Sequence, residues 1–181
     1  MTTRTSRTDG WAAADGGVSG RRIGHLTHRV IASLLEEGLR SPSPAELFEC
    51  VGSHELVASA SRYRTAARQQ LLTGAAVYFR LFCPPAGWEF LGSEVKAGGC
   101  RLDLVFARDG MVLADEIKAG AMASASDRDA LDEQIARQLA ASARKWGAAF
   151  AGVRAVLLAR PAMSFLAAPD GSRHPLTWKE T

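Results

Sequence analysis

Apolar and polar positions alternate most regularly in the middle of the chain, between Cys100 and Gly120. The stretch RLDLVF at 101–106 has the period of a half-buried strand, and a second apolar run follows at 111–118. Asp109-Gly110 separates the two runs, and Asp-Gly in this position is typical of a tight hairpin turn. The pattern therefore predicts two antiparallel strands joined at Asp109-Gly110.

Helical and strand periods elsewhere predict four helices and two more strands. The helices are expected at about 22–39, 44–52, 54–82 and 131–147, and the strands at about 88–96 and 153–158. Asp127 or Asp129 is expected to cap the last helix. Because a helix separates the last strand from the hairpin, we expect that strand to lie parallel to its neighbour after a crossover connection.

The length of the chain is that of one domain with flanking tails. We expect residues 1–20, rich in Thr, Ser, Arg and Gly, to form a disordered or loosely ordered tail. Residues 21–160 are expected to form a single domain, since 181 residues with 47% hydrophobic content can bury one full core. Residues 161–181 are expected to form a C-terminal loop and tail with at most one short strand.

Charge and cysteine content limit the partners, the metal sites and the cellular compartment that we expect for the protein. A net charge of +3 and a pI near 9.0 are compatible with a nucleic-acid partner without requiring one. The three cysteines, Cys50, Cys83 and Cys100, are widely spaced, so we expect neither a disulfide scaffold nor a zinc site. With no signal peptide and no long apolar run, the sequence predicts a cytoplasmic protein with no membrane association.

The predicted hairpin also brings charged residues together. Residues two apart on a strand share a face, so Glu116 and Lys118 point the same way, and pairing around the turn places Asp103 close to Glu116. Two adjacent carboxylates repel each other, and a divalent metal such as Mg²⁺ relieves that repulsion. The alternative is a solvated salt bridge of little energetic weight, but the apolar flanks of both strands indicate that the charges are not on an open face.

This pattern resembles the PD-(D/E)XK nuclease superfamily. Asp103 is followed after twelve residues by Glu116-x-Lys118, and Gly-x-Arg at 99–101 precedes the aspartate. Leu102 stands where the superfamily's name has a proline. The resemblance implies a restriction-endonuclease-like αβββαβ core, with a mixed central sheet flanked by helices and with extra helices at the N-terminus.

The first predicted helix resembles the RecB- and AddB-like branch of the superfamily. In that branch a Gly-x-x-x-His motif opens a helix, and Gly24 and His28 match the motif. The branch's histidine joins the two motif carboxylates on the metal, so the resemblance implies that His28 is a metal ligand. Read without the resemblance, a single histidine at the border of an apolar helical stripe is more often a core or boundary residue.

Two further positions bear on the same likeness. The branch carries Gln-x-x-x-Tyr on the helix after the hairpin, and Gln138 matches the glutamine while Ser142 replaces the tyrosine. The motif could instead begin at Gln134. Glu94 stands where the branch often carries a glutamate on its first core strand, and we expect no catalytic role for it.

The resemblance implies a divalent-metal-dependent nuclease that hydrolyses phosphodiester bonds, in DNA ahead of RNA. The metal would be Mg²⁺ or Mn²⁺, and the implied ligands are His28, Asp103, Glu116 and the backbone carbonyl of Ile117. The implied catalytic residues include Lys118, which would orient or activate the attacking water, and Gln138, which would support the site. DNA repair, recombination and phage defence are the expected settings.

The sequence is compatible with three interpretations of the whole chain, of which an active nuclease is the first. The chain has no P-loop and no helicase segment, so we expect a protein partner to supply any ATPase, helicase or targeting activity. A homo-oligomer is also compatible with the sequence. The alternative to an active nuclease is a catalytically weak, nuclease-fold subunit that binds DNA or acts as a scaffold. A third interpretation is a plain α/β domain, which predicts that Asp103 and Glu116 do not converge.

Basic residues at two places in the chain could contact a phosphate backbone. Lys96 and Arg101 flank the predicted site, and Arg62, Arg64 and Arg68 lie on one face of the long predicted helix. Solvated charges are the more common explanation for both groups.

Overall fold

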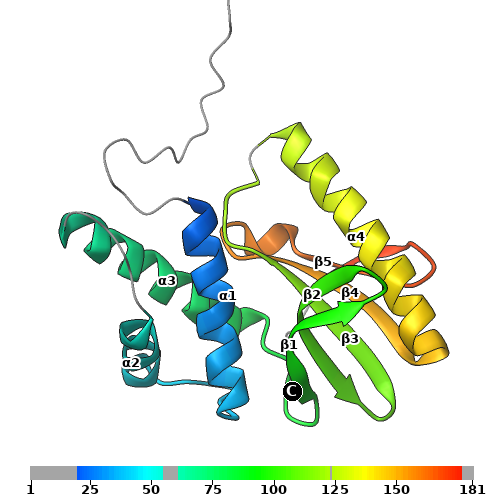
Figure 1. Ribbon diagram of the computed structural model, residues 1–181, viewed down its shortest axis with the longest axis horizontal. Helices are drawn as coiled ribbons and strands as arrows, with labels where there is room; N and C mark the ends of the chain where they lie inside the picture. The colour runs from blue at the N-terminus through cyan, green and yellow to red at the C-terminus, as the bar shows by residue number, and fades with distance from the viewer. Residues whose placement is uncertain (1–19, 55–60, 123, 177–181) are drawn as a thin grey trace, which may run out of the picture.

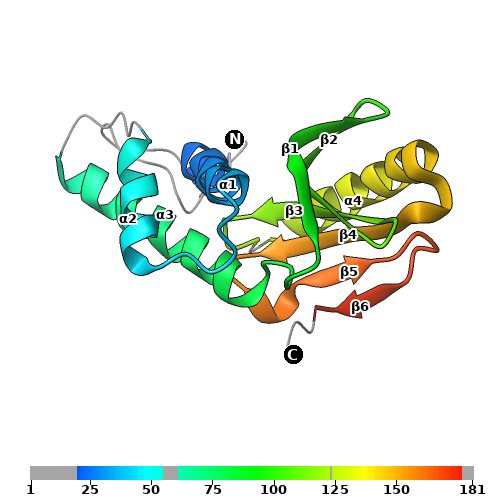
Figure 2. The ribbon, with the colours of Figure 1, turned by 90° about the horizontal axis from the view of Figure 1, so that it is seen from below.

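The computed structural model describes residues 20–54, 61–122 and 124–176. Its centre is one mixed sheet, with three helices gathered at one side and a fourth helix on the other (Figures 1 and 2). The predicted mixed α/β fold, a central sheet flanked by helices, is thereby confirmed. Within the described ranges, no helix combines the length and apolar character that crossing a membrane requires.

Four helices account for the described helical residues apart from two short 3₁₀ turns. They are α1 (Gly20–Glu36), α2 (Pro44–Ser53), α3 (Ser61–Leu81) and α4 (Ala125–Trp146), and the 3₁₀ turns span Gly147–Ala149 and Pro161–Met163. The first part of the helix expected at 54–82 falls on residues 55–60, which lie outside the described ranges. In every case the apolar stripe of the helix faces the sheet or a neighbouring helix.

The caps explain where two of the helices begin. Ser43 caps α2, accepting a hydrogen bond from the Glu46 backbone N–H, while the Glu46 side chain accepts one from the Ser43 N–H. Ser124 caps α4 in the same way, with Asp127 as its partner. The expectation that Asp127 or Asp129 is the cap is therefore wrong, because Asp127 closes the capping box from the first turn of the helix.

The six strands lie in the sheet in the order of the sequence. They are β1 (Glu89–Ala97), β2 (Cys100–Arg108), β3 (Met111–Lys118), β4 (Phe150–Leu157), β5 (Phe165–Ala167) and β6 (Arg173–Pro175). All neighbours are antiparallel except β3 and β4, which are parallel and joined by α4, as predicted. The C-terminal region differs from expectation, because it adds two short strands to the sheet where at most one was predicted.

Two tight turns set the register of the first three strands. Asp109 and Gly110, between β2 and β3, have φ of 50° and 77°, and Gly98 and Gly99, between β1 and β2, have φ of 49° and 86°. A two-residue hairpin turn with positive φ at both positions matches the twist of the strands. The hairpin predicted at Asp109-Gly110 is thus confirmed, and a second hairpin precedes it.

The sheet separates two apolar cores. Residues such as Leu104, Phe106 and Ile117 face α1, α2 and α3, while Val105 and Ala114 face α4. This alternation is the period of two expected for strands buried on both faces. As a result, β3 is buried along most of its length and only its ends approach solvent.

A fully buried ion pair links the sheet to α3. Arg154 on β4 donates to both oxygens of Asp115 on β3, each at 2.6 Å, and both side chains are buried. Tyr78 on α3 donates its hydroxyl to Asp115 at 2.9 Å, and Arg154 also donates to the Phe82 carbonyl at 2.8 Å. These contacts fix β3, β4 and the end of α3 to one another, on the sheet face opposite to Glu116.

The described residues include part of each predicted domain boundary. The tail predicted for residues 1–20 lies outside the described residues except for Gly20, which begins α1. The compact region continues past residue 160 through β5 and β6, and residues 177–181 lie outside the described ranges. The three cysteines are free thiols and are each partly buried.

Candidate functional site

Three carboxylates form a row across β1, β2 and β3. The register of β1 on β2 places Glu94 opposite Asp103. The register of β2 on β3, continued by one residue, places Asp103 opposite Glu116. The Ile117 backbone N–H donates to Asp103 Oδ2 at 2.8 Å, which fixes the aspartate against β3. The predicted convergence of Asp103 and Glu116 is therefore present, and Glu94 extends the row.

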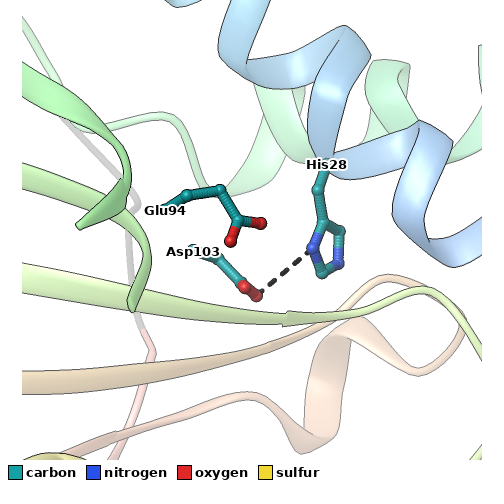
Figure 3. Close-up of side chains that lie close together, drawn as sticks. All are labelled: His28, Glu94 and Asp103. Atoms are coloured by element: carbon teal, nitrogen blue, oxygen red, sulfur yellow. Dashed lines mark ion pairs between the residues drawn. The ribbon is translucent and has the colours of Figure 1, made fainter. Parts of the chain in front are cut away.

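His28 on α1 faces this row and completes a cluster of three potential ligands. One ligand atom from each of His28, Glu94 and Asp103 lies within 4.8 Å of the other two, and the three side chains point toward one another (Figure 3). His28 Nδ1 lies 3.5 Å from Asp103 Oδ2. All three residues are partly buried, so the cluster is accessible to solvent but is not fully exposed.

The backbone of Glu94 has an unusual conformation for a strand. Its φ is 54°, in the left-handed region, and β1 is irregular just before it, between Phe90 and Gly92. A residue with a Cβ atom in this region costs roughly 1–2 kcal/mol. Such strain is concentrated at functional sites, where the surrounding structure holds it in place.

Arg101 neutralises part of the charge on Glu94. Its guanidinium forms an ion pair with Glu94 Oε2 from the neighbouring strand. One imidazole nitrogen and two carboxylates are ligands that a divalent cation such as Mn²⁺ accepts.

Both oxygens of Glu116 already accept hydrogen bonds from neighbouring side chains. Lys118 Nζ donates to Oε1 at 2.7 Å, and Gln138 Nε2 donates to Oε2 at 2.6 Å. Burial and the charge of Asp103 raise the pKa of Glu116, although Lys118 and Gln138 act in the opposite direction. The cluster of three thus differs from the expected ligand set, since Glu94 takes the place we assigned to Glu116.

The two candidate glutamines on α4 both contact the site. Gln138, which is buried, reaches Glu116 and also donates to the Arg101 carbonyl at 3.1 Å. Gln134 Oε1 accepts a hydrogen bond from Lys118 Nζ at 2.8 Å. Both glutamines therefore contact the site, whether the motif is taken to begin at Gln134 or at Gln138. Ser142, one turn beyond Gln138, is buried and makes no described contact with these residues.

The surroundings of His28 favour a positive charge. Burial lowers the pKa of this imidazole, but the hydrogen bond and charge of Asp103, the charge of Glu116 and a hydrogen bond to the Ile117 backbone outweigh burial. The pKa of His28 therefore lies above its usual 6.5. The Ile117 backbone thus reaches the cluster, while a role for its carbonyl as a metal ligand remains a prediction.

Glu94 belongs to the cluster, although we expected no catalytic role for it. The Gly98-Gly99 pair is itself a hairpin signal, and counting back from it places Glu94 opposite Asp103. The two consecutive hairpins together place the three carboxylates in one row.

The site as a whole combines the cluster of three potential ligands with a lysine on β3. His28, Glu94 and Asp103 can hold a divalent ion, and Lys118 is held beside them by Glu116 and Gln134. Such an arrangement can position a water molecule and stabilise negative charge on a bound anion. No known protein family and no curated protein matches the sequence, so the assignment of chemistry depends on the residues themselves.

Proposed function

We propose that this protein is a divalent-metal-dependent nuclease of the PD-(D/E)XK type, which hydrolyses phosphodiester bonds in DNA. The observation that carries the proposal is the convergence of His28, Glu94 and Asp103 beside Lys118. These four side chains come from four different elements, α1, β1, β2 and β3. Nothing in the packing of an ordinary α/β core requires them to meet.

The metal-binding residues in this proposal are His28, Glu94 and Asp103, with Glu116 adjacent to them. Mn²⁺ suits the imidazole nitrogen, and Mg²⁺ suits the carboxylate oxygens. When bound, the ion polarises a phosphoryl oxygen and lowers the pKa of a coordinated water. Asp103 is the most firmly placed ligand, because the Ile117 N–H already holds one of its oxygens.

Lys118 is the residue that acts on the attacking water in this proposal. Its ammonium carries three N–H donors, and Glu116 and Gln134 accept two hydrogen bonds from it. The third donor is left for a water or a phosphate oxygen. In this role Lys118 orients the water and stabilises the negative charge that develops on the phosphate.

The element order adds support to the family proposed. A helix, the strands β1, β2 and β3, the helix α4 and the parallel strand β4 follow one another along the chain, which is the order implied for the αβββαβ core. The cellular setting is proposed from the family that the sequence resembles. We place the nuclease in the cytoplasm, in DNA repair, recombination or phage defence, with a partner protein supplying any ATPase or helicase.

A cleavage assay tests the proposal. The purified full chain is incubated with linear duplex, closed circular or single-stranded DNA, in Mn²⁺, in Mg²⁺ or in EDTA. We expect metal-dependent cleavage that is lost in Asp103→Asn and Lys118→Ala and retained in Asp129→Asn, a matched control at an exposed position of α4. Equal cleavage by Lys118→Ala and the parent chain would contradict the role given to Lys118.

One observation favours a second candidate function, a nuclease-fold subunit that binds DNA with little catalysis. Ser142 stands where the RecB- and AddB-like branch has its tyrosine, and its side chain on α4 is buried. Under this alternative the chain binds DNA and Mn²⁺ but cleaves none of the three substrates. Metal binding measured by electron paramagnetic resonance, run beside the cleavage assay, separates the two functions.

A further inference from the structure

The tip of the β1–β2 hairpin lies against the C-terminal half of α4 (Figure 1). Lys145 Nζ donates to the Lys96 carbonyl at 2.7 Å. A Cβ atom placed on Gly98 would lie 3.3 Å from Ala141 Cβ and 3.5 Å from Arg144 Nη2. The hairpin tip therefore packs on the end of α4, with Ala97 and Leu102 facing the helix and Lys96 and Arg101, which are cross-strand partners, on the other face of the hairpin.

Four cationic side chains are exposed around this contact, and we call them the basic ridge. They are Lys96 and Arg101 from the hairpin and Arg144 and Lys145 from α4. Within the described part of the chain, no ion pair joins Lys96, Arg144 or Lys145 to a carboxylate. Like charges on neighbouring elements repel one another, and a bound polyanion relieves that repulsion.

Helix stability explains only part of the ridge. Cations in the last turn of a helix interact favourably with the helix dipole, which accounts for Arg144 and Lys145. It does not account for Lys96 and Arg101, which come from another element. The second half of α4, residues 137–146, also contains no Asp or Glu to balance them.

The ridge begins at the candidate site and leads away from it. Arg101 is two residues before Asp103 on β2, and its guanidinium reaches Glu94 of the metal-binding cluster. On α4, Lys145 lies seven residues beyond Gln138, which is about 10 Å at the helical rise of roughly 1.5 Å per residue. Phosphates on one DNA strand follow one another along the axis at about 3.4 Å, so the ridge spans several of them.

We propose that the basic ridge binds the phosphate backbone of the nucleic acid whose scissile bond enters the candidate site. This inference rests on the proposed function for its substrate class and adds the surface that holds the substrate. Arg101 lies nearest the cluster, and its planar guanidinium can bind a phosphate through two hydrogen bonds. Lys96, Arg144 and Lys145 hold the backbone farther along. The arginine-rich face of α3 is the rival surface.

Binding measured in EDTA tests the ridge without any need for cleavage. The double variant Lys96→Gln/Arg144→Gln removes two charges of the ridge, and the control Arg64→Gln/Arg68→Gln removes two charges from α3. Fluorescence anisotropy with a labelled duplex gives Kd over a series of salt concentrations, and circular dichroism checks the fold of each variant. Arg101 and Lys145 are not used because both make contacts within the fold.

We expect the ridge variant to bind the duplex at least tenfold more weakly than the parent at about 0.1 M salt. Its slope of log K against log salt should be smaller by nearly two, since each lost phosphate contact lowers the slope by about 0.9. The α3 variant should change little. Equal losses in both variants, a loss in the α3 variant alone, or a parent chain that binds no duplex would each overturn the inference.

The two proposals fail in different ways. A chain that binds DNA through the ridge but cleaves none with Mn²⁺ or Mg²⁺ removes the nuclease and leaves the ridge in place. A chain that cleaves DNA, with unchanged duplex binding in Lys96→Gln/Arg144→Gln, removes the ridge and leaves the nuclease in place.

Discussion

Arg101 and Glu94 form an ion pair across the β1–β2 hairpin, and the same Glu94 carboxylate belongs to the cluster with His28 and Asp103. A divalent cation held by this cluster would lie close to the guanidinium and repel it. The arginine and the metal therefore compete for one carboxylate. Metal binding would free the Arg101 side chain, while the hydrogen bond from Gln138 to its carbonyl keeps its backbone in place.

This competition predicts that Arg101→Ala binds Mn²⁺ more tightly than the parent chain. An exposed ion pair contributes up to roughly 1 kcal/mol, so its removal should improve Kd by as much as about fivefold. DNA cleavage should fall in the same variant, because a phosphate-binding group is lost. Isothermal titration with Mn²⁺ measures the first effect, with Lys96→Ala as the control. Weaker Mn²⁺ binding by Arg101→Ala would show that the arginine supports the cluster instead.

Manganese binding should strengthen as the pH rises. Burial lowers the pKa of His28, but Asp103, Glu116 and the Ile117 backbone together raise it above 6.5. A protonated imidazole cannot ligate a metal, so protons compete with Mn²⁺ below this pKa and cease to compete above it. Kd measured between about pH 5.5 and 8.5 should fall and then level off. The dependence should be shallower in His28→Gln, and binding that weakens with rising pH would contradict the assignment.

Gln138→Met should move the acid limb of the pH–rate profile to higher pH. The pKa of Glu116 is raised by burial and by Asp103, and the hydrogen bond from Gln138 opposes that rise. Without the amide, the buried carboxylate holds its proton to a higher pH, and cleavage that needs the ionised form is lost earlier as the pH falls. Gln134→Met, whose described partner is Lys118, is the matched control. An unchanged profile in Gln138→Met would show that ionisation of Glu116 does not limit the rate.

Arg154→Met should lower the free energy of unfolding by about 3–5 kcal/mol, because it leaves the buried charge of Asp115 without its partner. Denaturation in urea measures the change. Arg137→Met removes an exposed arginine that pairs with Glu133 on the surface of α4, and it should cost no more than about 0.5 kcal/mol. Similar losses in the two variants would mean that the buried pair has no special role.

The local parts of the fold were predictable because short-range chemistry determines them. Asp109-Gly110 adopts the backbone conformation that a tight hairpin needs, and this alone places Asp103 opposite Glu116. The helix periods likewise located α1 and most of α4, although α4 begins at Ala125, six residues before the predicted start. The cap of α4 was predicted at Asp127 or Asp129, but Ser124 is the cap and Asp127 completes the capping box from the first turn.

Contacts between residues far apart in the chain could not be predicted from the sequence, for physical reasons. Asp115 and Arg154 come from strands separated by α4, and an apolar run with one arginine does not reveal that the guanidinium is buried. Gln134 and Gln138 are one helical turn apart, so either could face the hairpin until the rotation of α4 is known. Glu94 required the register of a second hairpin, which its irregular strand partly obscures.

The left-handed backbone of Glu94 sets stability against function at a single position. Glycine adopts this conformation without the penalty that a Cβ atom brings, so Glu94→Gly should raise the melting temperature slightly while weakening Mn²⁺ binding. Thermal denaturation and metal titration of one variant would measure both effects. A redesign guided by folding energy alone would therefore replace this glutamate early, and would produce a sturdier protein with an impaired site.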